Sequence, residues 1–292
     1  MRTEPPVDRS EDLPVAVYTA ESQVRRPRLF LRGMWNDLRA SRELAWRLFV
    51  RDISAKYRQS LLGIFWAFGP PIITGWVFTV LQSRGIVNFG ETNIPYPVYV
   101  LVGTVLWQLF TESLAAPLRT VTAEKALLGK VNFPREALIV SSVYMVLMEM
   151  LIKLVVIAGV FVVFRIQPTW GLLLAPLAMF ALIMLGISIG LALTPLGMLY
   201  TDIAVSLPIG IQLFFFVTPV VFPPPTSFPM SLVTTLNPVG PLLVGARELI
   251  VLGTMSSPAL FMGVVGLTFG VLFAAWAMYR IAFPIIIERL SA

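Results

Sequence analysis

The stretch RLFVRDISAKYRQSLLGIFWAFGPP, residues 47–71, decides the fold class of this chain. At 100° per residue, its first half and the preceding residue place apolar side chains in one helical stripe: Trp46, Phe49, Val50, Ile53 and Tyr57. Basic side chains form a second stripe at least a quarter-turn away: Arg47, Arg51 and Arg58. A helix with these two faces lies in a membrane surface. Because no charge follows Arg58 until Arg84, this interfacial helix leads directly into a membrane span.

The composition is that of an integral membrane protein. Hydrophobic residues make up 57% of the 292 residues and charged residues 13%, about half the usual share in a soluble domain. This length accommodates six spans of ~20 residues with their loops, but not twelve. The chain contains neither cysteine nor histidine, which excludes disulfides, thiolate chemistry and the commonest metal ligand.

The sequence predicts an all-α membrane protein with six transmembrane helices. The expected parts are a largely disordered cytoplasmic tail at 1–40 with a short surface helix at 30–38, an amphipathic interfacial helix at 41–60, a transmembrane domain at 61–285 and a cytoplasmic tail at 286–292. The spans are expected at 62–82, 98–116, 137–164, 171–195, 204–222 and 258–283. Gly69, Pro70 and Pro71 are expected to kink the first span.

The distribution of Lys and Arg places both termini in the cytoplasm. The segment before the first span carries 12 of these residues, the loop after the second span 4, the end of the chain 2, and the outer loops together 3. Between spans five and six, Pro223–Pro225 are expected to stop the fifth span. Asn237-Pro238 would begin a short helix and Gly253 would end it. Such a helix cannot span a bilayer, so short re-entrant helices are expected on the outer side.

No segment matches the nucleotide-binding pattern G-x-x-x-x-G-K-[ST], because Gly129-Lys130 is followed by Val131. If the protein works by ATP, another chain binds the nucleotide. The basic loop 117–136 is interpreted either as a coupling helix that docks on a cytoplasmic ATPase or as a juxtamembrane loop that touches anionic lipid. Its candidate contact residues are Glu124, Lys125, Lys130, Arg135 and Glu136.

Glu149 and Lys153, four residues apart in the third span, can neutralise each other. They are interpreted as lining a pore, as a proton relay or as a structural ion pair. Arg247 and Glu248 are interpreted as lining the outer mouth or as an exposed ion pair, and Glu112 is expected to cap or to pair with a basic residue. The other candidates for a channel or outer gate are aromatic: Trp107, Phe214, Phe215 and Phe216.

Five segments in order resemble the marks of ABC-2 type permeases that export polysaccharides, in particular the Wzm-like exporters of O-antigen and cell-wall glycans. They are 47–71, Trp107-Gln-Leu-Phe110, Val131-Asn-Phe-Pro-Arg-Glu136, Thr218-Pro-Val220, and Asn237-Pro238 with Arg247-Glu248. The resemblance extends over residues 41–285. Exporters of teichoic acid and of capsule are near relatives of this group.

The resemblance implies a homodimer in the bacterial inner membrane, bound to two copies of an ABC ATPase that hold ATP and Mg. This chain would then be a transporter subunit without a cofactor of its own, would not be an enzyme, and would bind no nucleic acid. Residues 41–58 would form a gate helix resting on the ATPase, and the helices at 223–257 an outer gate. The cargo would be a polysaccharide on a polyprenyl diphosphate, for which a galactan is one candidate. The residues expected at the diphosphate are Arg47, Arg51, Lys56, Tyr57 and Arg58.

Three other classes of function remain as alternatives. A membrane enzyme that acts on polyprenyl phosphates would need clustered carboxylates, and no D-x-D or D-D-x-x-D pattern is present. A proton-coupled secondary transporter would use Glu149, although the chain shows no internal repeat. A membrane scaffold would need neither kinked spans nor re-entrant helices.

Overall fold

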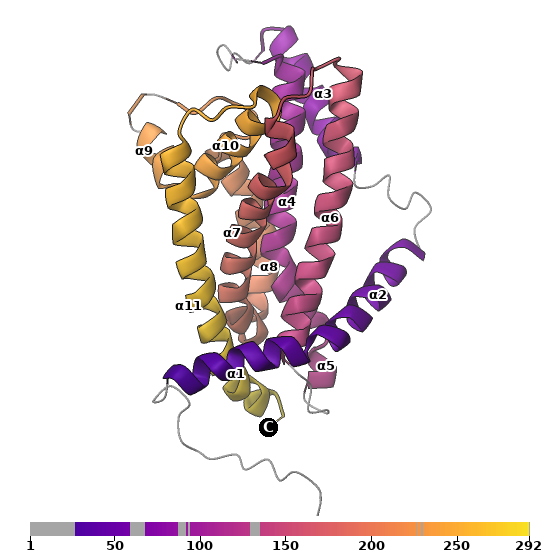
Figure 1. Cartoon of the computed structure of the whole chain (residues 1–292), viewed down its shortest axis with the longest axis vertical. Coiled ribbons are helices and arrows are strands. Elements are labelled where there is room, and N and C mark those ends of the chain that lie inside the picture. Colours follow the sequence, from indigo (N-terminus) through magenta and orange to yellow (C-terminus); the bar gives the residue numbers. More distant parts are fainter. Residues whose placement is uncertain are drawn as a thin grey trace, which may run out of the picture. The chain divides into compact units, whose positions relative to one another are not determined.

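The computed structural model describes residues 27–58, 68–86, 92, 94–128, 135–225, 227–228 and 230–291. These residues form helices joined by turns, and no strand occurs among them (Figure 1). Residues 1–40 and residues 41–292 are separate units. The helices are α1 (Pro27–Ala40) in the first unit and, in the second, α2 (Arg42–Arg58), α3 (Gly69–Ser83), α4 (Tyr96–Ala123), α5 (Lys125–Leu128), α6 (Arg135–Val163), α7 (Gly171–Leu199), α8 (Thr201–Val217), α9 (Met230–Leu236), α10 (Val239–Leu252) and α11 (Pro258–Ser291).

Four of the described helices, α4, α6, α7 and α11, are long and apolar enough to cross a membrane. The 28 residues of α4 extend ~42 Å, more than the ~30 Å of a bilayer's hydrocarbon core. The sequence predicted six spans, and these four candidate spans coincide with the second, third, fourth and sixth. The first and fifth predicted spans correspond to shorter helices, α3 with 15 residues and α8 with 17.

The prolines of the predicted first span begin the described helix instead of kinking it. α3 starts at Gly69, and Pro70 and Pro71 occupy its first turn. Proline is well tolerated there, because the first N–H groups of a helix have no acceptor within the helix. The part of the predicted span before Phe68 lies outside the described residues.

The helix α8 ends five residues before the predicted end of the fifth span. Its last residue is Val217, and Thr218 has an extended backbone with φ −93° and ψ 136°. Thr218 precedes Pro219, whose ring disfavours a helical conformation in the residue before it. The Thr218-Pro219 dipeptide therefore ends the helix before Pro223–Pro225 can do so.

The helix α4 continues into the range predicted as a loop, passes Pro117 and ends at Ala123. α7 packs against residues 110–117 of α4 through Gly186 and Gly190, which form a G-x-x-x-G pair. A β-carbon added to Gly190 would lie 2.2 Å from the carbonyl oxygen of Leu114 and 3.2 Å from Cδ of Pro117. Glycine therefore lets the two spans approach backbone to backbone.

Both termini of the described chain are more helical than expected. α11 continues through Ser291, beyond the predicted end of the last span at 283. α1 covers Pro27–Ala40 within the segment predicted as largely disordered, and it contains the surface helix expected at 30–38. Residues 1–26 lie outside the described part of the chain.

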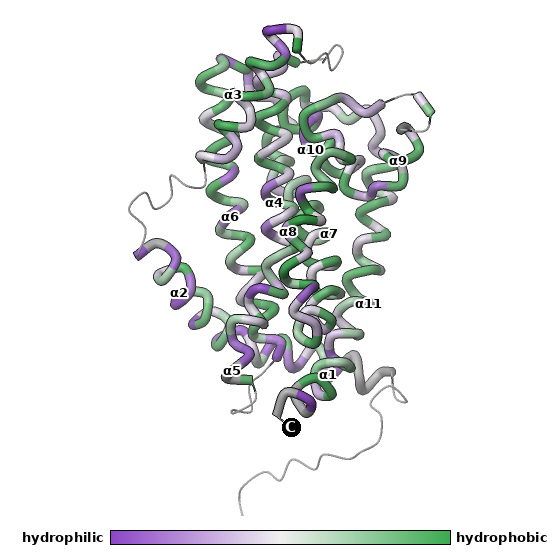
Figure 2. The backbone as a smooth tube through the Cα atoms, turned by 180° about the vertical axis from the view of Figure 1, so that it is seen from behind, coloured by the Kyte–Doolittle hydropathy of each residue, from purple (hydrophilic) through white to green (hydrophobic). Residues whose placement is uncertain are grey.

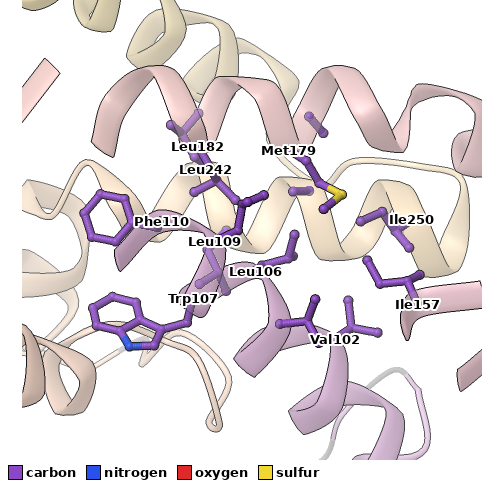
Figure 3. Close-up of a cluster of buried hydrophobic side chains, with 14 of the residues drawn as sticks. Val102, Leu106, Trp107, Leu109, Phe110, Ile157, Met179, Leu182, Leu242 and Ile250 are labelled. Carbon is purple, nitrogen blue, oxygen red and sulfur yellow. The ribbon is translucent and has the colours of Figure 1, made fainter. Parts of the chain in front are cut away.

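Two hydrophobic clusters join the helices of the second unit. The larger cluster joins α4, α6, α7 and α10, where Leu106, Met179 and Leu242 meet among others (Figure 3). The smaller cluster joins helices at the end of the bundle that bears α2 and α5, and it includes Ala45 of α2 and Phe283 of α11. Lipid tails are as apolar as these side chains, so in a membrane such clusters hold helices together by close packing.

Candidate functional site

The helix α2 packs against α6 (Figure 1). On its inner face Ala45, Leu48 and Phe49 are buried. Tyr144 of α6 lies edge-on to the rings of Trp46 and Phe49, with its centroid 6.0 Å from each. The predicted aromatic stripe is therefore divided, because Phe49 is buried against α6 while Trp46 remains 55% exposed. Figure 2 shows hydrophilic residues alternating with hydrophobic ones along α2.

Two ion pairs fasten the basic side of α2 to two different spans. Arg51 donates a hydrogen bond to Glu124, the residue that follows the last turn of α4, and another to the neighbouring Asp52. Lys56 donates a hydrogen bond to Glu149 of α6. One pair therefore holds the middle of α2 and the other holds its end.

The positive charge of Arg51 is strongly favoured. Partial burial opposes the charged guanidinium, but the hydrogen bonds and negative charges of Glu124 and Asp52 outweigh this and raise the pKa of Arg51 above its usual value. Arg47 pairs with Glu43 one turn away, at 2.6 Å, and both side chains are largely exposed. Such an exposed pair contributes less than ~1 kcal/mol. Arg58 is also exposed, and the side chain of Tyr57 lies outside the described part.

Glu149 is shared by two lysines. Lys153 lies one turn further along α6, with Nζ 3.4 Å from the second carboxylate oxygen, and only 4% of its side chain is exposed. The pairing of Glu149 with Lys153 is therefore confirmed. Lys56, the third member, stands 93 residues before Glu149, and no periodicity within either helix indicates that contact.

The acidic residues predicted to contact an ATPase, Glu124 and Glu136, are instead turned into the protein, each 8% exposed. Glu136, in the first turn of α6, accepts a hydrogen bond of 3.3 Å from Arg280 of α11. This pair and the pair of Glu124 with Arg51 connect two points of the predicted coupling loop, residues 124 and 136, to α11 and α2. The role of this loop as the contact with an ATPase stays a prediction.

The basic residues of the same loop have partners within the chain as well. Lys125, in α5, donates to the carbonyl oxygen of Met198 near the end of α7, at 3.3 Å. Arg135 lies over the ring of Phe283 in α11, with its guanidinium carbon 5.5 Å from the centroid. Lys130 lies outside the described residues. Around α5, Glu124 is thus tied to α2 and Lys125 to α7, while Arg135, at the start of α6, contacts α11.

The aromatic candidates for a channel join α4 to α8. Trp107 of α4 is 6% exposed, and its ring centroid lies 5.5 Å from that of Phe110, 6.1 Å from Phe214 and 5.8 Å from Phe215. Phe216 is 65% exposed on the outer side of α8. Glu149 instead pairs with Lys56 of α2 and with Lys153, so the residues predicted as one channel set lie at separate places.

A groove of about 650 Å³ lies between α4 and α8. Its α8 wall is apolar, and its α4 wall carries an ion pair between Glu112 and Arg119 at 3.4 Å. The expected pairing of Glu112 with a basic residue is thereby confirmed. Sequence analysis missed the groove, although the spacing of its α4 residues follows one helical face and could have indicated it. These residues are Thr111, Glu112, Ala115, Leu118, Arg119, Thr122 and Ala123.

Arg247 of α10 is a buried residue, with 2% of its surface exposed. Its guanidinium donates to the carbonyl oxygens of Pro219 and Val220, at 3.3 and 2.9 Å, and to the hydroxyl of Tyr99 in α4. It also lies over the ring of Tyr99, 3.5 Å from the centroid. The interpretation of Arg247 and Glu248 as an exposed ion pair is therefore wrong for Arg247.

The short helix predicted after Asn237 ends at Gly253 as expected and begins one residue later than expected, with Pro238 in the cap position and Val239 as its first residue. The side-chain oxygen of Asn237 accepts a hydrogen bond of 2.9 Å from the backbone N–H of Val239, the first residue of α10. Gly253 follows the last turn with φ 74°, a conformation that favours glycine. Glu248 accepts hydrogen bonds from the backbone and the hydroxyl of Ser256, at 2.7 and 2.8 Å, which ties α10 to the loop that follows it.

The sequence model of the ABC-2 type transporters matches residues 43–251, more than half of this chain. The chain belongs to the ABC-2 type transporter family. The part of this ABC-2 protein that matches extends from the first turn of α2 to the last turn of α10, and so contains the ion pairs, the groove and the buried arginine described above.

Two relatives of this ABC-2 protein are both named O-antigen export system permease protein RfbA. The protein from Klebsiella pneumoniae is 24% identical over 214 residues, 70% of this chain and 79% of the relative. The protein from Myxococcus xanthus is 26% identical over 220 residues, 73% of this chain and 82% of the relative.

Proposed function

We propose that this chain is the permease subunit of an ATP-driven exporter that moves a polysaccharide linked to polyprenyl diphosphate across the bacterial inner membrane. The observation that carries the proposal is the similarity, over most of both chains, to two proteins named as permeases of O-antigen export systems. Membership in the ABC-2 family supports it. Teichoic acid or capsule is the alternative cargo within this family, and a galactan is one candidate glycan.

The proposed assembly is a homodimer of this chain with two ATPase subunits that bind ATP and Mg. The absence of the pattern G-x-x-x-x-G-K-[ST] from the sequence supports the assignment of nucleotide binding to a partner. Both termini are proposed to be cytoplasmic, in line with the Lys and Arg distribution. Membrane lipids are the remaining partners, and α2 and α5 are the proposed contact with the ATPase.

The ionic contacts around α5 suggest how movement at the ATPase passes into the spans. Glu124 and Glu136 are buried and paired with Arg51 and Arg280, so they are placed to transmit a displacement instead of touching the partner. An ATPase that moves α5 would pull α2 through the pair of Glu124 with Arg51, and a movement of the start of α6 would pull α11 through the pair of Glu136 with Arg280.

The groove between α4 and α8 is the proposed start of the conduit for the glycan. Its volume of about 650 Å³ lies within the ~300–1,000 Å³ of ordinary ligand sites. The hydroxyls and charges of Thr111, Glu112, Arg119 and Thr122 offer hydrogen bonds to sugar hydroxyls along one wall.

The exposed arginines of α2 are the proposed first contact for the diphosphate. Arg51 is engaged by Glu124, whereas Arg58 and Arg47 are exposed at the surface of the helix. Each basic residue near an anionic headgroup contributes ~1 kcal/mol, so a charge reversal should cost ~2 kcal/mol, about thirtyfold in affinity.

Charge reversal of an exposed arginine tests this contact. We expect Arg58→Glu to lower export of the lipid-linked glycan at least tenfold in proteoliposomes, with the ATPase present. Arg84→Glu, an exposed residue just after α3, is the matched control and should leave export within twofold of wild type. Wild-type export by Arg58→Glu would remove α2 from the headgroup contact.

Affinity purification of the tagged chain from its own membranes tests the assembly. We expect an ABC ATPase to co-purify at one copy per permease chain and ATP hydrolysis to depend on that subunit. Recovery of the permease as a complete transporter without any ATPase would contradict the proposal. A proton-driven carrier would additionally lose coupling in Glu149→Gln, whereas ATP-driven export should keep its ATP dependence in that variant.

A further inference from the structure

The buried arginine of α10 holds together three parts of the chain that lie far apart in the sequence. Arg247 comes from α10, Tyr99 from α4, and the carbonyl groups of Pro219 and Val220 from the connection after α8. The acceptors described for this guanidinium are thus neutral oxygen atoms, and Arg247 itself is almost fully buried. A planar guanidinium with a fixed fork of donors suits several acceptors at once.

The connection at residues 218–222, here called the strap, is held at further points along its length. The hydroxyl of Tyr96 donates to the carbonyl oxygen of Val221 at 3.1 Å, and that of Tyr99 to Phe222 at 2.9 Å. The side-chain amide of Asn237, just before α10, donates to the hydroxyl of Thr218 at 2.9 Å. The strap is therefore fixed to α4 on one side and to the start of α10 on the other.

Two glycines allow the backbones of α4 and α7 to approach the strap and α10 closely. A β-carbon on Gly103 of α4 would lie 2.3 Å from the carbonyl oxygen of Val220 and 2.9 Å from Nη1 of Arg247. A β-carbon on Gly171, at the start of α7, would lie 1.9 Å from the carbonyl oxygen of Leu249 in α10. The backbones of α4 and α7 thus touch the strap and α10 directly.

Hydrophobic packing also holds α10 against α4 and α7. Leu242 and Ile250 of α10 are fully buried and belong to the cluster that contains α4 and α7 (Figure 3). The neighbouring helix α9 differs, because Leu232 and Leu236 are 52% and 73% exposed. Among the described helices, α9 packs chiefly against the beginning of α10.

We infer that Arg247 is a positioning residue that fixes α10 and the strap to α4 as an immobile wall, and that α9 is the element that moves when this end of the protein opens. The inference rests on the proposed function, because it concerns the end of the export path. It predicts that transport leaves the contacts of Arg247 intact while the surroundings of α9 change.

The first experiment needs only the purified full chain. Hydrogen–deuterium exchange read by mass spectrometry should show α10 and the strap exchanging at least tenfold more slowly than α9. Arg247→Gln should raise exchange of the strap and α10 at least tenfold, whereas Arg84→Gln, an exposed arginine just after α3, should leave it within twofold. Gly103→Ala keeps every hydrogen-bonding group but introduces a β-carbon that clashes with the strap, so it should raise exchange of the strap and α10 as Arg247→Gln does. It therefore provides the same test if Arg247→Gln fails to fold.

The second experiment follows movement in the complex with its ATPase. The chain has no cysteine, so an environment-sensitive fluorophore can be placed on Leu236→Cys in α9 or on Leu252→Cys in α10. ATP should change the signal at α9 at least threefold more than the signal at α10. In the Arg247→Gln variant, ATP should also change the fluorescence at α10. If Arg247 only stabilised the fold, its loss would not make the α10 signal depend on ATP.

Each result bears on the inference. Exchange of α10 that stays within twofold of wild type in both Arg247→Gln and Gly103→Ala would overturn the role of Arg247. An ATP response at α10 as large as that at α9 in the otherwise wild-type chain would overturn the fixed wall. Failure to find any ATPase or any ATP response would count against the proposed function and the moving α9, while the exchange experiment still decides the role of Arg247.

Discussion

Glu149→Gln should be more damaging to the fold than Lys153→Met, although the two residues form one ion pair. Unit charges 3.4 Å apart attract by ~5 kcal/mol at an effective dielectric constant of ~20. A glutamine would still accept a hydrogen bond, but Lys153, with 4% of its side chain exposed, would lose its carboxylate. Leaving a buried charge without its partner costs several kcal/mol, so we expect Glu149→Gln to lower the free energy of unfolding by about 2–4 kcal/mol.

Lys153→Met removes the lysine and leaves Glu149 with its second partner, Lys56. In Lys153→Met the carboxylate of Glu149 keeps Lys56, so the expected loss is only about 1–2 kcal/mol. The double variant removes both buried charges, and Lys56, with 43% of its side chain exposed, can turn to water. The double variant should therefore be less destabilised than Glu149→Gln alone.

Reversible unfolding in mixed micelles, followed by far-ultraviolet circular dichroism, measures these differences. Glu43→Gln is the matched control, because its pair with Arg47 is exposed and should change stability by less than ~1 kcal/mol. A loss for Lys153→Met equal to that for Glu149→Gln, or strictly additive losses in the double variant, would refute the idea that Glu149 is shared between Lys56 and Lys153.

Two further predictions concern the contacts between spans. Reversal of either Glu136 or Arg280 alone should lower ATP-driven export at least fivefold, and the double variant Glu136→Arg with Arg280→Glu should restore at least half, because the pair connects α6 to α11. Gly190→Ala should lower the free energy of unfolding by about 1–3 kcal/mol, because its β-carbon would lie 2.2 Å from the carbonyl oxygen of Leu114.

Each of these has its own control. For the charge exchange, a double variant no better than the single reversals would show that the two side chains do not act through each other. For the glycine, Gly266→Ala on α11 meets no atom within 4 Å, so it should leave stability unchanged or raise it by up to ~1 kcal/mol. Equal losses at Gly190 and Gly266 would contradict the role of close packing between α4 and α7.

Local chemistry made much of the fold predictable. The apolar runs that became α4, α6, α7 and α11 follow from length and composition, since a span needs ~20 apolar residues. The start of α10 at Asn237-Pro238 and its end at Gly253 follow from capping. The end of α8 could also have been predicted, because Pro219 disfavours a helical conformation at the preceding residue, Thr218, and this effect is local.

The groove between α4 and α8 could be predicted only in part from the sequence. The polar residues of α4 repeat along one helical face, but only packing shows that α8 covers them with an apolar wall. The pair of Glu149 with Lys153 follows from helical spacing, whereas the third member, Lys56, depends on how α2 lies along α6.

Arg247 shows most clearly what only the tertiary structure decided. Its neighbour Glu248 suggested an exposed ion pair, yet the side chain is buried against α4 and the strap. The difference arises because a side chain's partners are set by the elements that pack beside it, and Tyr99 stands 148 residues away.

The stretch at 47–71 likewise has features that the sequence determines and features that only the tertiary structure decides. Its sequence alone determined that a basic, amphipathic helix precedes an apolar segment, because residue type and the period of 3.6 suffice for that. Only the tertiary structure decided that Arg51 and Lys56 meet carboxylates of two other helices. Helical period is a property of neighbouring residues, whereas an ion pair between helices depends on the packing of the whole bundle.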